Sequence, residues 1–237
     1  MARTIKIDNA LLKQFSKKSK KEKSSKELIT YFLIVCEGEK TEPNYFRAFP
    51  KKAGRLVFDI ELEGGGISTL KVVEKAIDLR NSSSQKYDRV WAVFDRDSFK
   101  ADSFNNAILK AKANEIECAW SNEAFELWYL LHFHNRVTAM SRDDYKKAIE
   151  TAVNDKIKKG KKHFQYQKND PDMFTLLNKF GRQDLAIRWA KELSERITGE
   201  KFANYNPNTQ VYKLVEELIG KSEKLNTEII DKYSKGL

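Results

Sequence analysis

The chain has 237 residues, which is enough for one large domain or two small ones with a hydrophobic core. Its apolar content of 41% favours a folded globule and argues against a disordered chain. Lys and Arg number 44 against 34 Asp and Glu, a formal net charge of +10 that favours attraction to polyanions, above all nucleic acid. A solvated lysine-rich surface would produce the same excess of positive charge.

Cysteine use and hydropathy indicate the compartment. The two cysteines, Cys36 and Cys118, both fall in predicted strands, so we expect small buried hydrophobic residues in a reducing environment and no disulfide. Their spacing is not that of a metal site. No apolar stretch approaches the roughly 20 residues of a membrane span, and the N-terminus lacks the apolar segment of a signal peptide. We therefore expect a cytoplasmic protein with no membrane partner.

Residues 1–27 form a basic arm. Nine Lys or Arg residues stand there against Asp8, Glu22 and Glu27. The stretch from Ser16 to Ser25 has no hydrophobic anchor, so we expect it to stay mobile until it meets phosphate. A solvated tail without a specific role is the alternative.

The first predicted strand anchors the rest of the chain. Ile29 to Cys36 is an almost unbroken apolar run, rich in β-branched and aromatic residues. This pattern is typical of a central parallel strand that is buried on both faces. The run ends at Glu37-Gly38. Because open α/β sheets bind their ligands at the carboxyl ends of their strands, Glu37 is the first candidate site residue.

Helices and strands then alternate. In chain order we predict a helix at Glu42–Pro50, a strand at Leu56–Leu62, a helix at Ser68–Arg80, a buried strand at Arg89–Phe94, a helix at Asp102–Asn114, a strand at Glu115–Trp120 and an apolar helix at Glu123–Phe133 capped by Ser121-Asn122. Such alternation predicts an α/β domain over residues 28–135, with a mostly parallel four-stranded sheet flanked by helices.

Beyond residue 135 the pattern changes to helices and basic loops. We predict helices near 141–156, 172–180, 183–198, 209–219 and 223–234, so that residues 136–237 form a mainly helical region packed on the α/β domain. The loop from Lys156 to Lys168 mixes basic and aromatic residues, which suits phosphate contact and base stacking. Its candidate nucleic-acid contacts are Lys161, Lys162, His163, Tyr166 and Lys168. A surface loop held by two aromatic side chains is the alternative.

Acidic residues follow the predicted strands. Glu37 follows the first strand, Asp95 and Asp97 follow the third, and Glu123 and Glu126 come after the fourth. Two positions apart on an extended backbone, Asp95 and Asp97 point the same way. Oxygen ligands of this kind suit Mg²⁺ or Mn²⁺, which would also allow a phosphate to approach the carboxylates. An isolated Asp-x-Asp is more often a capped loop, but here it follows one buried strand while Glu37-Gly38 follows another.

These residues resemble a known family. Glu37-Gly38 and Asp95-Arg-Asp97 resemble the Toprim domain of topoisomerases, primases and OLD-type nucleases. The longer motifs are similar to the RloB family: Cys36-Glu-Gly-Glu-Lys-Thr-Glu-Pro-Asn-Tyr-Phe46, Val93-Phe-Asp-Arg-Asp97, Ser121-Asn-Glu-Ala-Phe-Glu-Leu-Trp-Tyr-Leu-Leu-His-Phe133, Tyr166-Gln-Lys168 and Asn206-Pro-Asn-Thr-Gln-Val-Tyr-Lys-Leu-Val215. The resemblance runs from about Tyr31 to Glu217. Glu123 departs from it, because the family pattern has Pro there, and this leaves Glu126 as the better ligand.

The resemblance implies a Toprim-fold nuclease of restriction and phage-defence loci, with an ABC-type ATPase as a possible partner. A related two-component system pairs such an ATPase with an effector that cleaves transfer RNA. By this resemblance Glu37 is the acid/base carboxylate or a shared metal ligand, Asp95 and Asp97 are metal ligands, and Glu126 is an additional ligand. Lys40 would stabilise developing phosphorane charge, although it could equally pair with Glu42. The implied substrate contacts are Asn122, Tyr166, Lys168 and Asn206.

The sequence therefore predicts a Mg²⁺-dependent (or Mn²⁺-dependent) endonuclease that acts on nucleic acid, with RNA, including transfer RNA, ahead of DNA. The alternatives are a DNA nuclease and a non-catalytic module that binds nucleic acid or a partner in a defence complex. A Toprim nucleotidyl transferase ranks last, because no stretch indicates a nucleoside triphosphate pocket. A homo-oligomer is possible on this reading.

Overall fold

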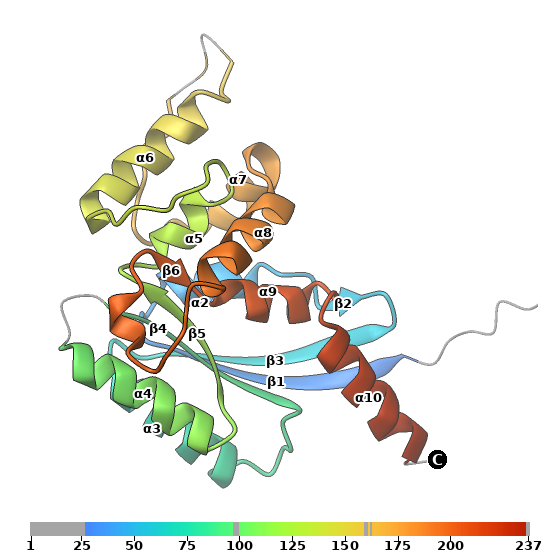
Figure 1. The fold of residues 1–237 in the computed structure, drawn as a ribbon. Helices are drawn as coiled ribbons and strands as arrows, with labels where there is room; N and C mark the ends of the chain where they lie inside the picture. The colour runs from blue at the N-terminus through green and yellow to red at the C-terminus, as the bar shows by residue number, and fades with distance from the viewer. Residues whose placement is uncertain (1–26, 97–99, 159–160, 162, 236–237) are drawn as a thin grey trace, which may run out of the picture.

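A computed structural model describes residues 27–96, 100–158, 161 and 163–235 (Figure 1). The basic arm, apart from its last residue, lies outside these described residues. The strands are β1 (Leu28–Cys36), β2 (Lys52–Ala53), β3 (Leu56–Gly64), β4 (Arg89–Asp95), β5 (Glu117–Asn122) and β6 (Asn208–Thr209). The helices are α2 (Thr41–Arg47), α3 (Thr69–Ser82), α4 (Ala101–Ala113), α5 (Glu126–Leu130), α6 (Arg142–Asn154), α7 (Met173–Phe180), α8 (Gln183–Ser194), the 3₁₀ turn η1 (Phe202–Asn204), α9 (Val211–Leu218) and α10 (Glu223–Lys235).

The sheet has six strands in the order β2-β3-β1-β4-β5-β6, and its four inner strands are parallel. These four are the predicted strands, so the α/β class and the mostly parallel sheet are confirmed. The prediction of four strands was wrong, because β2 and β6 add short antiparallel pairings at the two edges. Each is only two residues long, too short to show an alternating pattern, and β6 comes from the predicted helical region.

Helices cover both faces of the sheet (Figure 1). Side chains of β1 alternate between the faces: Leu33 and Val35 pack with α3 and α4, whereas Phe32, Ile34 and Cys36 face the core shared with α2, α5 and α9. Burial on both faces explains why this strand is apolar at nearly every position. The core that contains Phe32, Ile34 and Cys36 also includes side chains of α6, α7, α8 and α10, so it joins the helical region to the sheet.

Strand order reverses at β1. The chain passes from β1 through α2 to β3 on one side, and then through α3 to β4 on the other side. The connection that leaves β1 runs through α2 on one face of the sheet, and the connection that leaves β4 runs through α4 on the opposite face, so the two diverge beyond the carboxyl ends of β1 and β4. Such a switch point leaves a crevice in which α/β sheets bind ligands.

The apolar helix predicted at Glu123–Phe133 is shorter in the structure. Strand β5 runs through Ser121 and Asn122, which were predicted as the cap, and α5 begins only at Glu126. The peptide bond between Asn122 and Glu123 is cis. The backbone N–H of Phe125 donates to the Asp95 carboxylate, so the segment between β5 and α5 supplies a hydrogen bond to the acid at the end of β4. Turns follow α5 up to Phe133.

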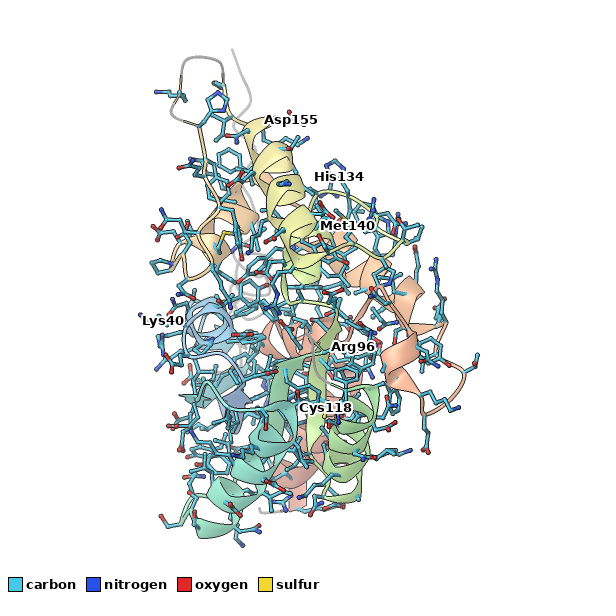
Figure 2. All side chains as sticks on the ribbon, turned by 90° about the vertical axis from the view of Figure 1, so that its left-hand side faces the viewer. Lys40, Arg96, Cys118, His134, Met140 and Asp155 are labelled. Carbon is cyan, nitrogen blue, oxygen red and sulfur yellow. The ribbon has the colours of Figure 1, made fainter. Side chains whose placement is uncertain are left out.

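Helix α6 projects from the body of the molecule (Figure 1). Figure 2 shows Asp155, just beyond its last residue, far from Lys40 and Arg96. At 1.5 Å per residue the 13 residues of α6 are about 20 Å long. The returning chain is held to the helix by Asn154, whose side chain makes two hydrogen bonds with the Phe164 backbone. Within the described residues, no helix is long and apolar enough to cross a membrane.

Candidate functional site at the ends of β1 and β4

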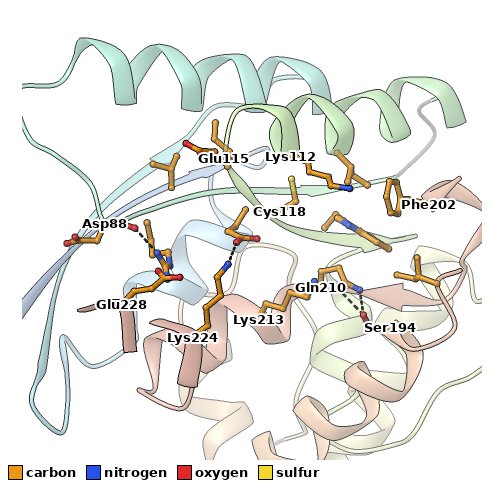
Figure 3. Close-up of a pocket in the computed structure, with 17 residues that line it drawn as sticks. Asp88, Lys112, Glu115, Cys118, Ser194, Phe202, Gln210, Lys213, Lys224 and Glu228 are labelled. Atoms are coloured by element: carbon orange, nitrogen blue, oxygen red, sulfur yellow. Dashed lines mark hydrogen bonds and ion pairs between the residues drawn. The ribbon is translucent and has the colours of Figure 1, made fainter. Parts of the chain in front are cut away.

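Two cavities in the described structure differ in their relation to the predicted site. The larger, of about 680 Å³, lies along the β5 edge between α4 and the C-terminal helices (Figure 3). It is lined by Cys118, Trp120 and Lys213 among others, and by none of the predicted site residues. The smaller, of about 360 Å³, opens at the switch point and is lined by Glu37, Lys40, Asp95, Glu126 and Lys168. We place the candidate site in this second cleft.

Glu37 and Asp95 come together because their strands are neighbours. The Glu37 backbone N–H donates to Val93 O at 2.8 Å, which extends the pairing of β1 and β4 by one residue. The Glu37 carboxylate then accepts a hydrogen bond from the Asp95 backbone N–H, with Oε2 3.0 Å from that nitrogen. The structure thus brings these two candidate site residues together at one sheet edge.

Asp95 is the last residue of β4, and it is buried. Its Oδ2 accepts hydrogen bonds from the Phe125 backbone N–H at 3.0 Å and from Arg142 Nη2 at 3.3 Å. Its Oδ1 is buried and has no hydrogen-bond partner among the described residues. Burial, reinforced by the carboxylates of Glu42 and Glu126, raises the pKa of Asp95 well above its ordinary value, and Arg142 opposes this. The cleft is therefore short of positive charge.

Glu42 is a cleft acid that was not among the predicted site residues. It lies in the first turn of α2, is 6% exposed, and has a buried Oε2 without a hydrogen-bond partner among the described residues. Burial raises its pKa, its own backbone opposes this, and Glu126 adds to the rise. The carboxylate lies against Gly38, where a β-carbon would overlap with it, so the glycine after Glu37 makes room for Glu42. In the sequence, the available signal for this site residue was an acid, Glu42, a few positions after the Glu37-Gly38 pair.

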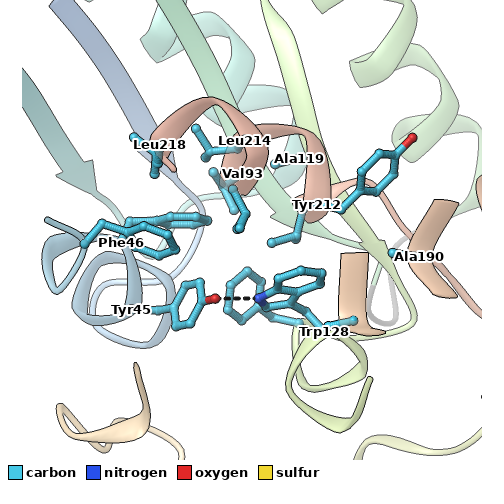
Figure 4. Close-up of a cluster of buried hydrophobic side chains, with 14 of the residues drawn as sticks. Tyr45, Phe46, Val93, Ala119, Trp128, Ala190, Tyr212, Leu214 and Leu218 are labelled. Carbon is cyan, nitrogen blue, oxygen red and sulfur yellow. Dashed lines mark hydrogen bonds between the residues drawn. The ribbon is translucent and has the colours of Figure 1, made fainter. Parts of the chain in front are cut away.

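Glu126 enters the cleft from the start of α5. The Tyr166 hydroxyl donates to its Oε1 at 3.0 Å. Behind it, Trp128 Nε1 donates to the Tyr45 hydroxyl at 2.7 Å, in a cluster of edge-to-face aromatic rings that locks α5 to α2 (Figure 4). Burial and the neighbouring Glu126 carboxylate raise the pKa of Tyr166, so the hydroxyl stays a donor.

Two lysines lie at the rim of the cleft. Lys40 precedes α2, and Lys168 lies in the segment that returns from the α6 projection. Thr41 Oγ1 donates to Lys168 O at 2.7 Å, which ties this returning segment to the start of α2. Both lysine side chains are exposed and border the acidic interior. Acidic groups inside the cleft suit a bound metal ion, and lysines at its rim suit a phosphate that contacts this ion.

The family model of RloB-like protein matches residues 32–218. The chain belongs to the RloB-like family. This confirms the resemblance that the motifs carry, and the match spans every element that contributes to the cleft. Comparison with curated proteins and with solved structures gave no match.

Several predicted contacts of this RloB-like protein lie away from the cleft. Asn122 is fully buried, and its amide donates to the carbonyl oxygens of Ala203 and Tyr205, both at 3.0 Å. Asn206 belongs to that same segment, next to β6. The exposed residues Lys161 and His163 follow the far end of α6. Asp97 and Lys162 lie outside the described residues.

The donor set of the RloB-like cleft fits a hard divalent cation in chemistry and charge. Glu42 and Asp95 are both buried, and each has a carboxylate oxygen without a hydrogen-bond partner among the described residues. Oxygen ligands of this kind are those that Mg²⁺ and Mn²⁺ prefer. In the side-chain positions observed, however, no three His, Cys, Asp or Glu residues of the described chain converge closely enough to hold a metal ion. Side chains would therefore have to shift to complete a coordination sphere.

Proposed function

We propose that this RloB-like protein is a Toprim-type, Mg²⁺-dependent phosphodiesterase that cleaves nucleic acid. The observation that carries the proposal is the cleft at the switch point, where acids from β1, α2, β4 and α5 meet under a rim of lysines. Burial and the neighbouring carboxylates raise the pKa of Glu42 and of Asp95, and this accumulation of acidic groups favours the binding of a divalent cation.

Each residue of the cleft has a distinct part in this proposal. Asp95 and Glu42 would hold the cation through their buried oxygens, and Glu126, oriented by Tyr166, would add a further ligand. Glu37, which is half-buried at the cleft wall, would act as the acid/base carboxylate or share the metal. When bound, the ion would polarise the phosphoryl group and lower the pKa of a water molecule. Lys40 is placed to stabilise negative charge that develops on the phosphate.

RNA is the proposed substrate class, with transfer RNA as the leading candidate and DNA as the alternative. The support is the net charge of +10, the basic residues beside the α6 projection, and the association of the RloB family with defence loci. In such a locus the protein would act as a cytoplasmic effector against phage, under the control of an ABC-type ATPase partner.

The test is incubation of the purified full chain with total transfer RNA and with duplex DNA, each with Mg²⁺, Mn²⁺ or EDTA. We expect discrete RNA fragments that disappear with EDTA, with Glu37→Ala and with Asp95→Asn. Glu74→Gln is the matched control, because Glu74 pairs with Lys110 on the surface of α3, outside the cleft. Fragments that persist in EDTA or in both cleft variants would refute the proposed site.

A second candidate function is a non-catalytic module that binds nucleic acid or a protein partner. The ion pair between Arg142 and Asp95, and the lack of convergence of three acids in the described residues, favour a structural use of the acidic cluster. This candidate predicts RNA binding without cleavage at any metal concentration, and with any partner present. The same incubation, followed by a gel-shift measurement, separates the two functions.

A further inference from the structure

We propose that Arg142 is an exchangeable cation of the cleft: its guanidinium neutralises Asp95 until a divalent ion binds there, and then contacts the phosphate of the substrate. The inference rests on the proposed function and adds to it a residue that couples metal binding to substrate binding. Arg142 was not among the predicted site residues, because it lies 47 positions from Asp95 in the sequence.

The geometry of the ion pair permits exchange. Arg142 Nη2 contacts Asp95 Oδ2 at 3.3 Å, whereas the Phe125 backbone N–H holds the same oxygen at 3.0 Å. A contact of this length to one carboxylate oxygen is weaker than the bidentate arrangement that arginine and carboxylate can form. The Arg142 side chain is 25% exposed against 11% for Asp95, although its Nε is buried. Asp95 therefore keeps its anchor to the backbone of residue 125 when the arginine moves.

Helix α6 holds the Arg142 backbone in place while its side chain moves. Arg142 is the first residue of this helix, and Ser141 caps it by accepting a hydrogen bond from the Asp144 backbone N–H. The helix packs on α5 through buried Tyr145 and Ile149. A fixed backbone with a long side chain lets the guanidinium shift between the Asp95 carboxylate and the mouth of the cleft without any change of fold.

Charge decides which partner the guanidinium takes. Of the three cations that line the cleft, Arg142 is the one with an ion pair to a cleft acid in the described structure; Lys40 and Lys168 lie at the rim. A divalent ion on Asp95 would repel the guanidinium a few ångströms away and compete for the same carboxylate. A phosphate at the cleft mouth then offers the arginine two oxygens in the planar geometry that it binds best.

The observed arrangement of acids agrees with this exchange. No three acids of the described chain converge on a metal position, and Arg142 is paired with the central one, Asp95. Removal of the guanidinium should free Asp95 Oδ2 from its contact with Arg142 and lower the positive charge at the cleft. Both changes favour a divalent cation.

The decisive measurement is Mn²⁺ affinity of the full chain, followed by the electron paramagnetic resonance signal of free Mn²⁺. We expect Arg142→Gln to bind Mn²⁺ about tenfold more tightly than wild type, because a competing charge is lost. Arg142→Lys should stay near wild type, since it keeps the charge. Lys146→Gln is the matched control: it removes a cation of the same helix that pairs with exposed Asp143, and its Mn²⁺ affinity should not change.

Cleavage supplies the second half of the test. Arg142→Gln should cleave RNA at least about tenfold more slowly at saturating Mn²⁺, and Arg142→Lys should lose part of the activity, because an ammonium lacks the fork that binds phosphate. Tighter metal binding together with slower cleavage is the signature of exchange. A structural role would give weaker Mn²⁺ binding and a lower unfolding midpoint.

The outcomes separate this inference from the proposed function. Wild-type protein that binds Mn²⁺ and cleaves RNA, with an unchanged or weakened Mn²⁺ affinity in Arg142→Gln, overturns the exchange alone. Wild-type protein that neither binds Mn²⁺ nor cleaves RNA with its partner present overturns both. A loss of Mn²⁺ affinity in the Lys146→Gln control would also count against exchange, because the effect would then not be specific to the cation at Asp95.

Discussion

Acidification should destabilise this protein through one buried histidine. His132 is 2% exposed, and its Nδ1 lies 2.9 Å from Trp128 O. A carbonyl oxygen only accepts, so the neutral ring donates through Nδ1. Its other faces meet the Trp128 ring at a centroid distance of 5.0 Å and the backbone of Gly181, where an added β-carbon would lie 2.7 Å from the His132 Cβ. Burial therefore removes an imidazolium at this position from the bulk water that would solvate its charge.

The sign and the magnitude follow from the pKa. Burial lowers the pKa of His132 from 6.5 to about 4, against the opposing effect of backbone hydrogen bonds. Below pH 6.5 His132 binds a proton in the unfolded chain but stays neutral in the folded chain. The free energy of unfolding is therefore at its full value above pH 6.5 and falls as the pH falls towards 4. A shift of this size removes about 2 kcal/mol of unfolding free energy between pH 7.5 and pH 5, and about 3 kcal/mol by pH 4.

The assay is urea unfolding of wild type and His132→Asn at pH 7.5, 6 and 5. Other groups titrate in both proteins, so the difference between the two curves isolates His132. We expect the stability advantage of wild type to shrink by about 2 kcal/mol from pH 7.5 to pH 5. His134→Asn is the matched control, since His134 is exposed and its replacement should leave the wild-type pH dependence intact. Parallel curves for wild type and His132→Asn would refute the reasoning.

Two further predictions concern the cleft. Gly38→Ala should lower Mn²⁺ affinity about tenfold or more, because the new β-carbon displaces the Glu42 carboxylate. The control is Gly199→Ala, where the nearest atom to the new β-carbon is 4.0 Å away and Mn²⁺ should bind as in wild type. Equal Mn²⁺ titrations of the two variants would contradict the placement of Glu42. Tyr166→Phe removes the donor to Glu126 and should lower the unfolding free energy by about 1.5 kcal/mol, with slower RNA cleavage; unchanged urea unfolding would show that this hydrogen bond contributes nothing.

Local patterns were enough to locate the strands that carry the site. An unbroken apolar run identified β1, because a strand buried on both faces has no solvent-facing positions to make polar. Glu37 directly follows β1, and Asp95 is the last residue of β4. These two acids lie close together because neighbouring parallel strands end at the same edge of the sheet. The motifs around them also predicted the family, which the family model confirms.

Long-range contacts decided which other side chains lie beside these acids. Glu42 was read as a helix residue that could pair with Lys40, and only the fold of α2 across the end of β1 places it on Gly38. Arg142 reaches Asp95 because α6 packs on α5, and no local pattern encodes that packing. Tyr166 meets Glu126 in the same way, after the chain has travelled out along α6 and returned.

The sequence alone therefore determined the class of fold, the parallel core of the sheet and the first two acids of the site, because each depends on residues adjacent in the chain. The tertiary structure decided the two edge strands, the early end of α5, the burial of Asn122 and the cations and acids that surround Asp95. Pairing of two-residue strands and the meeting of charges from distant helices have no sequence period. They arise when apolar faces pack together and bring the attached polar groups into one cleft.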